Sequence, residues 1–193
     1  MAGDLEGSGP ARVREALVGI STSGGRTLGH GFWADSLGTV LTADEVVAEA
    51  AERGERLRVR TASGRAHPVE PDALTRCPEL GLAWLTPTEP AAARPLPVAE
   101  AAPRPGCAVL LPGARPGTLL GTGTALTGGP APALLLSGVL LLDLPPGVEP
   151  APGLPVLDPV TGVVLGLLAP RLRGLSAGAL GAVPLTAARH ATG

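Results

Sequence analysis

The chain of 193 residues contains no lysine, asparagine, glutamine or tyrosine, and aromatic residues make up only 2% of it. All fifteen basic residues are therefore arginines. These absences remove the amine, amide and phenol groups on which many catalytic sites depend. They also leave few rings on which bases or sugars can stack. The codons of the missing residues are mostly AT-rich, so the composition indicates a GC-rich bacterial genome.

Strong charge and long hydrophobic runs are absent as well. The formal net charge is -2, so no basic footprint indicates a nucleic-acid partner. The longest apolar run, residues 134–142, is interrupted by Ser137 and Gly138. It is far shorter than the ~20 residues that span a bilayer. We therefore expect neither a nucleic-acid partner nor a membrane helix.

Cysteine is scarce, and so are metal-ligand patterns. Cys77 and Cys107 are too few for a disulfide framework, so we expect two free buried thiols, with a single disulfide as the alternative. No His or Cys residues share the spacing of metal ligands, so we expect no metal and no cofactor. The first ten residues lack the basic start and apolar stretch of a secretory signal, which makes the cytoplasm the expected location.

What the chain does contain is 28 glycines, 22 prolines and 45% hydrophobic residues. The apolar fraction is too high for a disordered chain, and many short strands joined by Gly/Pro turns explain both features. We expect one helix in the first half and one at the C-terminus, at 43–53 and 185–190. Predicted strands are residues 13–20, 27–34, 39–42, 57–61, 80–85, 107–111, 117–126, 133–143, 155–157, 163–168 and 179–184.

Several phrases occur in a familiar order. They are Gly29-His30-Gly31-Phe32-Trp33-Ala34-Asp35, Gly38-Thr39-Val40-Leu41-Thr42-Ala43-Asp44-Glu45-Val46-Val47, Pro78-Glu79-Leu80-Gly81-Leu82-Ala83-Trp84-Leu85, Pro150-Ala151-Pro152-Gly153-Leu154-Pro155-Val156-Leu157-Asp158, Thr161-Gly162-Val163-Val164-Leu165-Gly166-Leu167 and Gly181-Ala182-Val183-Pro184-Leu185. Together they resemble bacterial trypsin-like serine peptidases over residues 12–190.

The resemblance implies an all-β fold of two six-stranded antiparallel β-barrels, with the cleft between them. A short helix follows the third strand, and another ends the chain. The implied organisation is a flexible N-terminal tail (1–11), a first β-barrel (12–86), a Pro/Ala-rich connector (87–105), and a second β-barrel with the C-terminal helix (106–193).

The chain departs from the family at the residues that do its chemistry. Glu45 stands where the family has its histidine base, Gly81 where it has the aspartate, and Pro152 where it has the nucleophilic serine. The two backbone N–H groups of the oxyanion hole fall on Pro150 and Pro152, and proline has no N–H. The resemblance therefore implies a degenerate domain without a catalytic triad.

Other residues offer few substitutes. Ser137 and Ser176 lack a glycine elbow and a histidine near them in sequence, and we interpret them as ordinary hydroxyls. We expect His30 to be structural or partly exposed, and His67 and His190 to lie on the surface. The arginines at 53, 56, 58, 60 and 65 are interleaved with acids, which predicts a solvated face.

Three residues are candidates for binding. Leu154 replaces a glycine and is expected to crowd the cleft. Asp44 and Glu45 form either a charged cleft for an arginine-rich partner or, as the simpler interpretation, an exposed acidic pair favoured by the helix dipole.

The sequence thus predicts a catalytically inactive protein-binding or scaffolding module. A protein partner comes first and a homodimer second, and by analogy the setting is a bacterial signalling or defence system. Two alternatives stay open. One is a residually active serine endopeptidase with a rearranged site, and the other is a peptide or small-molecule sensor that uses the vacated cleft.

Overall fold

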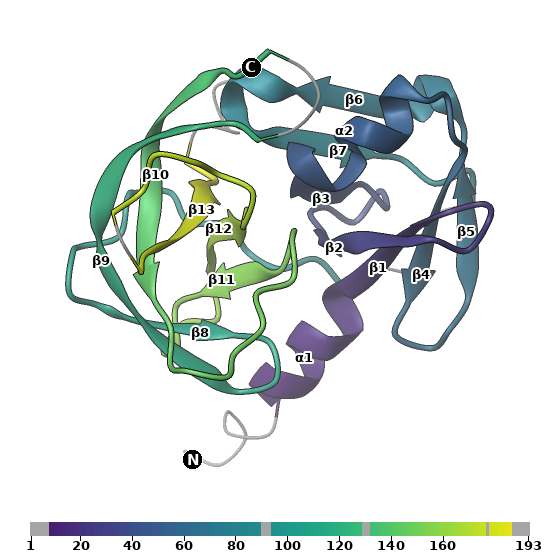
Figure 1. The fold of residues 1–193 in the computed structure, drawn as a ribbon. Coiled ribbons are helices and arrows are strands. Elements are labelled where there is room, and N and C mark those ends of the chain that lie inside the picture. Colours follow the sequence, from purple (N-terminus) through teal and green to yellow (C-terminus); the bar gives the residue numbers. More distant parts are fainter. Residues whose placement is uncertain (1–7, 90–93, 129–131, 177, 187–193) are drawn as a thin grey trace.

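The computed structural model describes residues 8–89, 94–128, 132–176 and 178–186. They form two β units side by side, with a helix before the first (Figure 1). No helix in these ranges is long and apolar enough to cross a membrane.

The N-terminal unit is an antiparallel sheet of seven strands in the order β5–β4–β1–β2–β3–β7–β6. Alternation builds its inner face: Leu57 and Val59 of β4 are buried, whereas Arg58 and Arg60 between and after them are exposed. The elements are β1 (Leu17–Thr22), β2 (Thr27–Trp33), β3 (Val40–Ala43), α2 (Asp44–Glu52), β4 (Leu57–Thr61), β5 (Ala66–Val69), the 3-10 turn η1 (Pro71–Ala73), β6 (Leu74–Cys77), the 3-10 turn η2 (Pro78–Leu80) and β7 (Leu82–Leu85).

This sheet differs from the expected six-stranded barrel. The strand β6 pairs with β7 and adds an edge that the sequence did not predict. The opposite edge is β5, where Pro68 has no N–H to offer a further strand. The Pro68 carbonyl instead accepts hydrogen bonds from the backbone N–H and the hydroxyl of Thr88. The chain after β7 therefore covers this edge.

The C-terminal unit is a closed six-stranded barrel in the order β10–β13–β12–β11–β8–β9, as the sequence predicts. Its strands are β8 (Ala108–Leu111), β9 (Arg115–Leu126), β10 (Leu135–Asp143), β11 (Pro155–Leu157), β12 (Val164–Leu168) and β13 (Leu180–Pro184).

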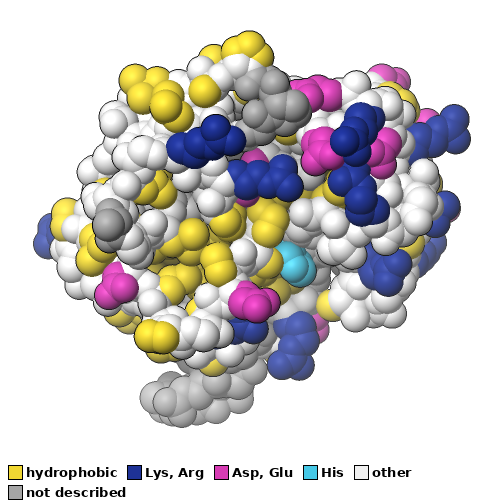
Figure 2. All heavy atoms as spheres, in the orientation of Figure 1, with side chains coloured by type: hydrophobic (Ala, Val, Ile, Leu, Met, Phe, Trp, Pro, Cys, Tyr) yellow, Lys and Arg dark blue, Asp and Glu magenta, His cyan; other side chains and the backbone are white. Residues whose placement is uncertain are grey.

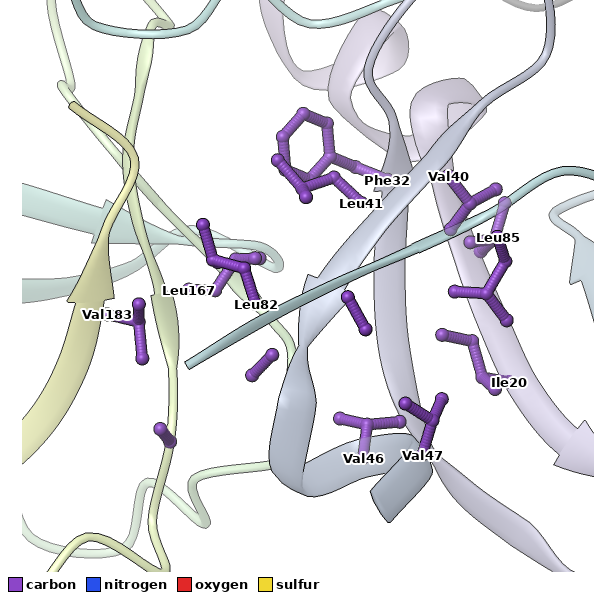
Figure 3. Packing of buried hydrophobic residues seen from close by; sticks show 14 of the residues in the cluster. Ile20, Phe32, Val40, Leu41, Val46, Val47, Leu82, Leu85, Leu167 and Val183 are labelled. Atoms are coloured by element: carbon purple, nitrogen blue, oxygen red, sulfur yellow. The ribbon is translucent and has the colours of Figure 1, made fainter. Parts of the chain in front are cut away.

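The larger hydrophobic core runs from one unit into the other. It joins residues such as Phe32 and Leu82 of the sheet to Leu167 and Val183 of the barrel, all of them almost fully buried. Figure 3 shows Leu82 beside Leu167, with Val183 beyond them on the barrel side. Because the core is continuous, the junction between the units is held by packing and does not depend on catalytic groups.

Three segments correct or limit the sequence predictions. A helix, α1 (Ser8–Ala16), occupies part of the predicted tail and the start of the predicted strand at 13–20. The connector is anchored: Leu96 is buried, its N–H donates to the Trp33 carbonyl, and Val98 forms a parallel bridge with Val164. Most of the predicted C-terminal helix, from residue 187 on, and residues 1–7 lie outside the described residues.

Candidate functional site

The residues at the three triad positions come from separate elements that meet at the junction of the two units. Glu45 lies in the first turn of α2, directly after β3. Next to it, the Asp44 N–H donates to the Gly81 carbonyl at 2.8 Å. The Pro152 carbonyl accepts from the His30 N–H of β2 at 2.9 Å. These contacts place Gly81 beside the start of α2 and Pro152 beside β2.

Glu45 is a half-buried carboxylate that reaches across to the barrel unit. Its two oxygens lie 3.1 and 3.3 Å from the backbone N–H donor of Arg171, in the loop between β12 and β13. Burial raises the pKa of Glu45 to about 7, although the Arg171 N–H and the Arg171 charge act in the opposite direction. The side chain of Glu45 therefore links α2 to the barrel. With a pKa of about 7, it is about half protonated at pH 7.

Asp44 contradicts the expectation of an exposed acidic pair. Its side chain is 8% exposed. Arg76 of β6 binds it through two hydrogen bonds, Nε to Oδ1 at 2.7 Å and Nη2 to Oδ2 at 2.9 Å. The same contact raises the pKa of Arg76. Asp44 is thus committed to a buried ion pair and is not free to hold a basic partner.

Gly81 has no room for a side chain. It ends η2 in the left-handed region, with φ 68°. A Cβ here would lie 2.9 Å from Leu136 Cδ1 and 2.9 Å from Val183 Cγ2, both side chains of the barrel unit. The barrel therefore packs directly on the backbone where an orienting carboxylate would stand.

The loop around Pro152 lies tightly against β2. A Cβ on Gly29 would come within 2.6 Å of the Pro152 carbonyl oxygen. Gly153 has φ +78°, and a Cβ there would collide with the His30 carbonyl oxygen. That same oxygen accepts the Thr42 hydroxyl at 2.6 Å. Both contacts therefore require glycine. The backbone of β2 holds the Pro152 loop in place on the side of the sheet.

Leu154 is not a binding residue, in contrast to the sequence prediction. It is 8% exposed and packs in the hydrophobic cluster of the barrel unit. Its side chain points into the core because the loop turns at Gly153 and leads directly into β11. Leu154 therefore anchors the loop and does not crowd the cleft.

The histidines fall in different places. His30 is half-buried as expected, and burial lowers its pKa. His67 was expected on the surface but is only 2% exposed, because the β5 alternation turns it inward opposite Val59. Neither ring nitrogen of His67 has a hydrogen-bond partner. His190 lies outside the described residues.

The remaining candidates have no catalytic partner in the described part of the chain. Ser137 on β10 and Ser176 are exposed, and neither hydroxyl hydrogen bonds to an imidazole there. Cys77 and Cys107 are free and half-buried, so the alternative of a single disulfide is wrong. Burial and the Glu79 carboxylate raise the pKa of Cys77 to about 11. The described residues contain no group of three His, Cys, Asp or Glu side chains that could hold a metal.

One hollow of the molecule is lined by residues of the connector and the barrel. Its volume is about 400 Å³, and it opens where the connector crosses the barrel. Lining residues include Ala99, Arg104, Cys107, Asp158 and Leu165, and none of the three triad positions.

Sequence analysis missed Arg76 and Arg171, the two residues that engage the acids at 44 and 45. Arg171 is 126 positions from Glu45, and only its backbone N–H is used. No side-chain pattern signals a backbone donor. Nothing in the sequence distinguishes Arg76 from the other arginines. Only the pairing of β6 with β7 places it beside α2.

Comparison with known proteins shows what the chain resembles. The structure matches the crystal structure of Deg5 with a TM-score of 0.70 and 20% identity, over 95% of this chain and 90% of that one. It matches the MamO protease domain from Magnetospirillum magneticum, in its apo form, with a TM-score of 0.71 and 20% identity, over 93% and 97%. No protein-family model and no curated protein matches the chain. The chain thus has the trypsin-like serine protease fold, which confirms the predicted fold class.

Proposed function

We propose that this chain is a catalytically inactive trypsin-like domain that works by binding another protein. The observation that carries the proposal is the state of the three triad positions. Glu45 accepts a hydrogen bond from a backbone N–H of the barrel. Gly81 is packed against Leu136 and Val183. The Pro152 carbonyl accepts a hydrogen bond from the backbone of β2. Each position is occupied by a structural contact.

The chemistry of acyl transfer supports the same proposal. It needs a nucleophile, a base and donors for the oxyanion. Pro152 supplies no nucleophile, and neither Pro150 nor Pro152 can donate a backbone N–H. Loss of one oxyanion donor costs a serine peptidase roughly 10²–10³ in rate. Loss of both, together with the nucleophile and the base, leaves no route to an acyl-enzyme.

The fold itself does not need the triad, because the continuous core holds the two units together. Such a domain can keep its shape while its surface is used for binding. A protein partner in a bacterial signalling or defence system is our first candidate, and a second copy of the chain is the next.

Capture of a partner from the native host tests the proposal. The tagged wild type is compared with Glu45→Arg, which disrupts the contact with Arg171, and with Glu45→Gln, which keeps an acceptor for its N–H. We expect one specific partner in stoichiometric amount, retained by all three proteins. Loss in Glu45→Arg alone would move the binding surface to the old cleft, and absence of a partner from every sample would contradict the proposal.

A further inference from the structure

The outer face of β4 carries three arginines without an ion pair in the described part of the chain. Arg56 precedes the strand, Arg58 and Arg60 lie on it, and all three are exposed. None of them forms an ion pair with any residue that the structure describes, whereas Arg26, Arg53, Arg65 and Arg76 all do. We call Arg56, Arg58 and Arg60 the arginine strip.

The sheet surface beside the strip carries small residues. Across the sheet, Arg58 is paired with Ser21 of β1 and Pro68 of β5, and Arg60 with Gly19 and Ala66. These neighbours are small, and a Cβ added to Gly19 would meet no atom within 4 Å. Figure 2 shows basic side chains running down the right-hand edge of the molecule, over β4 and β5. The guanidinium groups thus stand above a surface on which a chain can lie.

The nearest acid in the sequence does not cancel this charge. Glu55 precedes Arg56 directly, but its carboxylate binds Arg26 at 2.8 Å and lies 3.9 Å from Arg53. Glu70 follows Val69, the partner of Leu57, and so lies across from Arg56, whereas Arg58 and Arg60 lie opposite Pro68 and Ala66. Arg58 and Arg60 therefore have no acid opposite them on β5, in a protein whose net charge is -2.

We propose that the arginine strip is the docking surface for an acidic, extended segment of the partner protein. The inference rests on the proposed function and names the surface and the partner chemistry. Alternate residues of a strand lie about 6.8 Å apart on one face. An extended segment with Asp or Glu at every second position has the same spacing, so its carboxylates pair with successive guanidinium groups.

A single-stranded nucleic acid fits the surface less well. Proteins that bind such strands combine positive charge with aromatic rings on which bases stack. The residues paired with Arg58 and Arg60 on this face are glycine, serine, alanine and proline, and none has an aromatic ring. The arginine strip provides positive charge without stacking surfaces. An acidic peptide needs only the charge, so it fits the strip better than a single-stranded nucleic acid does.

Fluorescence anisotropy with the full chain tests the inference. The probe is a labelled ten-residue peptide in which glutamate alternates with serine. The strip variant is Arg58→Glu with Arg60→Glu. The control is Arg104→Glu with Arg115→Glu, two exposed and unpaired arginines of the barrel side. Both variants have the same net charge, so a difference between them reports position.

We expect the strip variant to bind the peptide about ten-fold more weakly than the wild type, and the control less than two-fold more weakly. A peptide of the same composition with its five glutamates in one block should also bind more weakly. An equal loss in both variants, or absence of binding at 50 mM salt, would overturn the inference. A ten-nucleotide oligothymidylate that binds as tightly as the peptide would overturn the choice of partner.

These outcomes are separate from those that bear on the proposed function. Peptide hydrolysis by the wild type would refute catalytic inactivity whatever the strip binds. A captured host protein that the strip variant retains would refute the docking surface and leave the binding function intact.

Discussion

At the scale of the residue, Glu45 combines a raised pKa with a contact between the two units. Its ordinary pKa of 4.5 rises to about 7 in the fold because burial disfavours the charged form. The folded protein therefore binds more protons than the unfolded chain between these values. The stability that this group contributes is fully present below pH 4.5 and is lost as the pH rises through 7.

We expect Glu45→Gln to be more stable than the wild type at pH 8, by about 2 kcal/mol, and nearly equal to it at pH 4.5. Urea unfolding at both pH values measures the difference. Glu70→Gln, at an exposed acid, is the matched control. A constant difference between the Glu45 variant and the wild type across this range would show that the carboxylate is not desolvated in the fold.

His67 is a second residue with a strained environment. Both of its nitrogens are buried without a hydrogen-bond partner, and each such group costs about 1–3 kcal/mol. We therefore expect His67→Leu to raise the free energy of unfolding at pH 7 by about 1–3 kcal/mol, measured in urea. His67→Asn keeps polar atoms at the site and should bring no gain. A less stable leucine variant would contradict this account.

At the scale of the element, one ion pair joins α2 to the edge strand β6. Arg76 lies 2.7 Å from Asp44, and both side chains are largely shielded from water. Removal of one partner leaves the other charged and unpaired in a poorly solvated place. The pair therefore fixes where the helix starts.

We expect Arg76→Leu to cost about 3 kcal/mol of unfolding free energy. Asp44→Asn in the same chain should recover at least half of that loss, because no uncompensated charge remains. A double-mutant cycle by chemical denaturation measures the coupling. If the losses of unfolding free energy in the two single variants added up in the double variant, packing alone would position α2.

The Pro152 loop depends in the same way on one glycine. Gly153 has a positive φ and no space for a Cβ beside the His30 carbonyl, so Gly153→Ala should cost about 3 kcal/mol or more. Gly147 also has a positive φ but open space around it, so Gly147→Ala should cost only about 1 kcal/mol. Thermal unfolding measures the loss of stability in each variant. Similar losses of stability in the two variants would mean that the Pro152 loop does not pack against β2.

At the scale of the whole molecule, much of the fold follows from the sequence. Phrases such as Gly29–Asp35 and Pro150–Asp158 predict the fold through their resemblance to trypsin-like peptidases, and the many glycines and prolines indicate turns between short strands. The phrases at 38–47, 78–85 and 150–158 contain Glu45, Gly81 and Pro152, the residues that the resemblance assigns to one site.

The rest could not be predicted, because it depends on contacts distant in sequence. The ion pair of Asp44 depends on how β6 pairs with β7, and the bond of Glu45 depends on a backbone N–H 126 residues away. His67 is buried because the pairing of β5 with β4 turns it inward opposite Val59. Helix α1 replaces part of a predicted strand because residues 13–20 fit either structure by their apolar content.

The most direct test of the central claim is covalent labelling of the purified wild-type chain with a fluorophosphonate, followed by intact-mass spectrometry. An active serine peptidase is treated in parallel as the positive control. The resemblance assigns Pro152 to the nucleophile position, and neither Ser137 nor Ser176 hydrogen bonds to an imidazole within the residues that the structure describes, so we predict no increase in mass. A stoichiometric adduct on a single serine would contradict the account and show that a rearranged catalytic site exists.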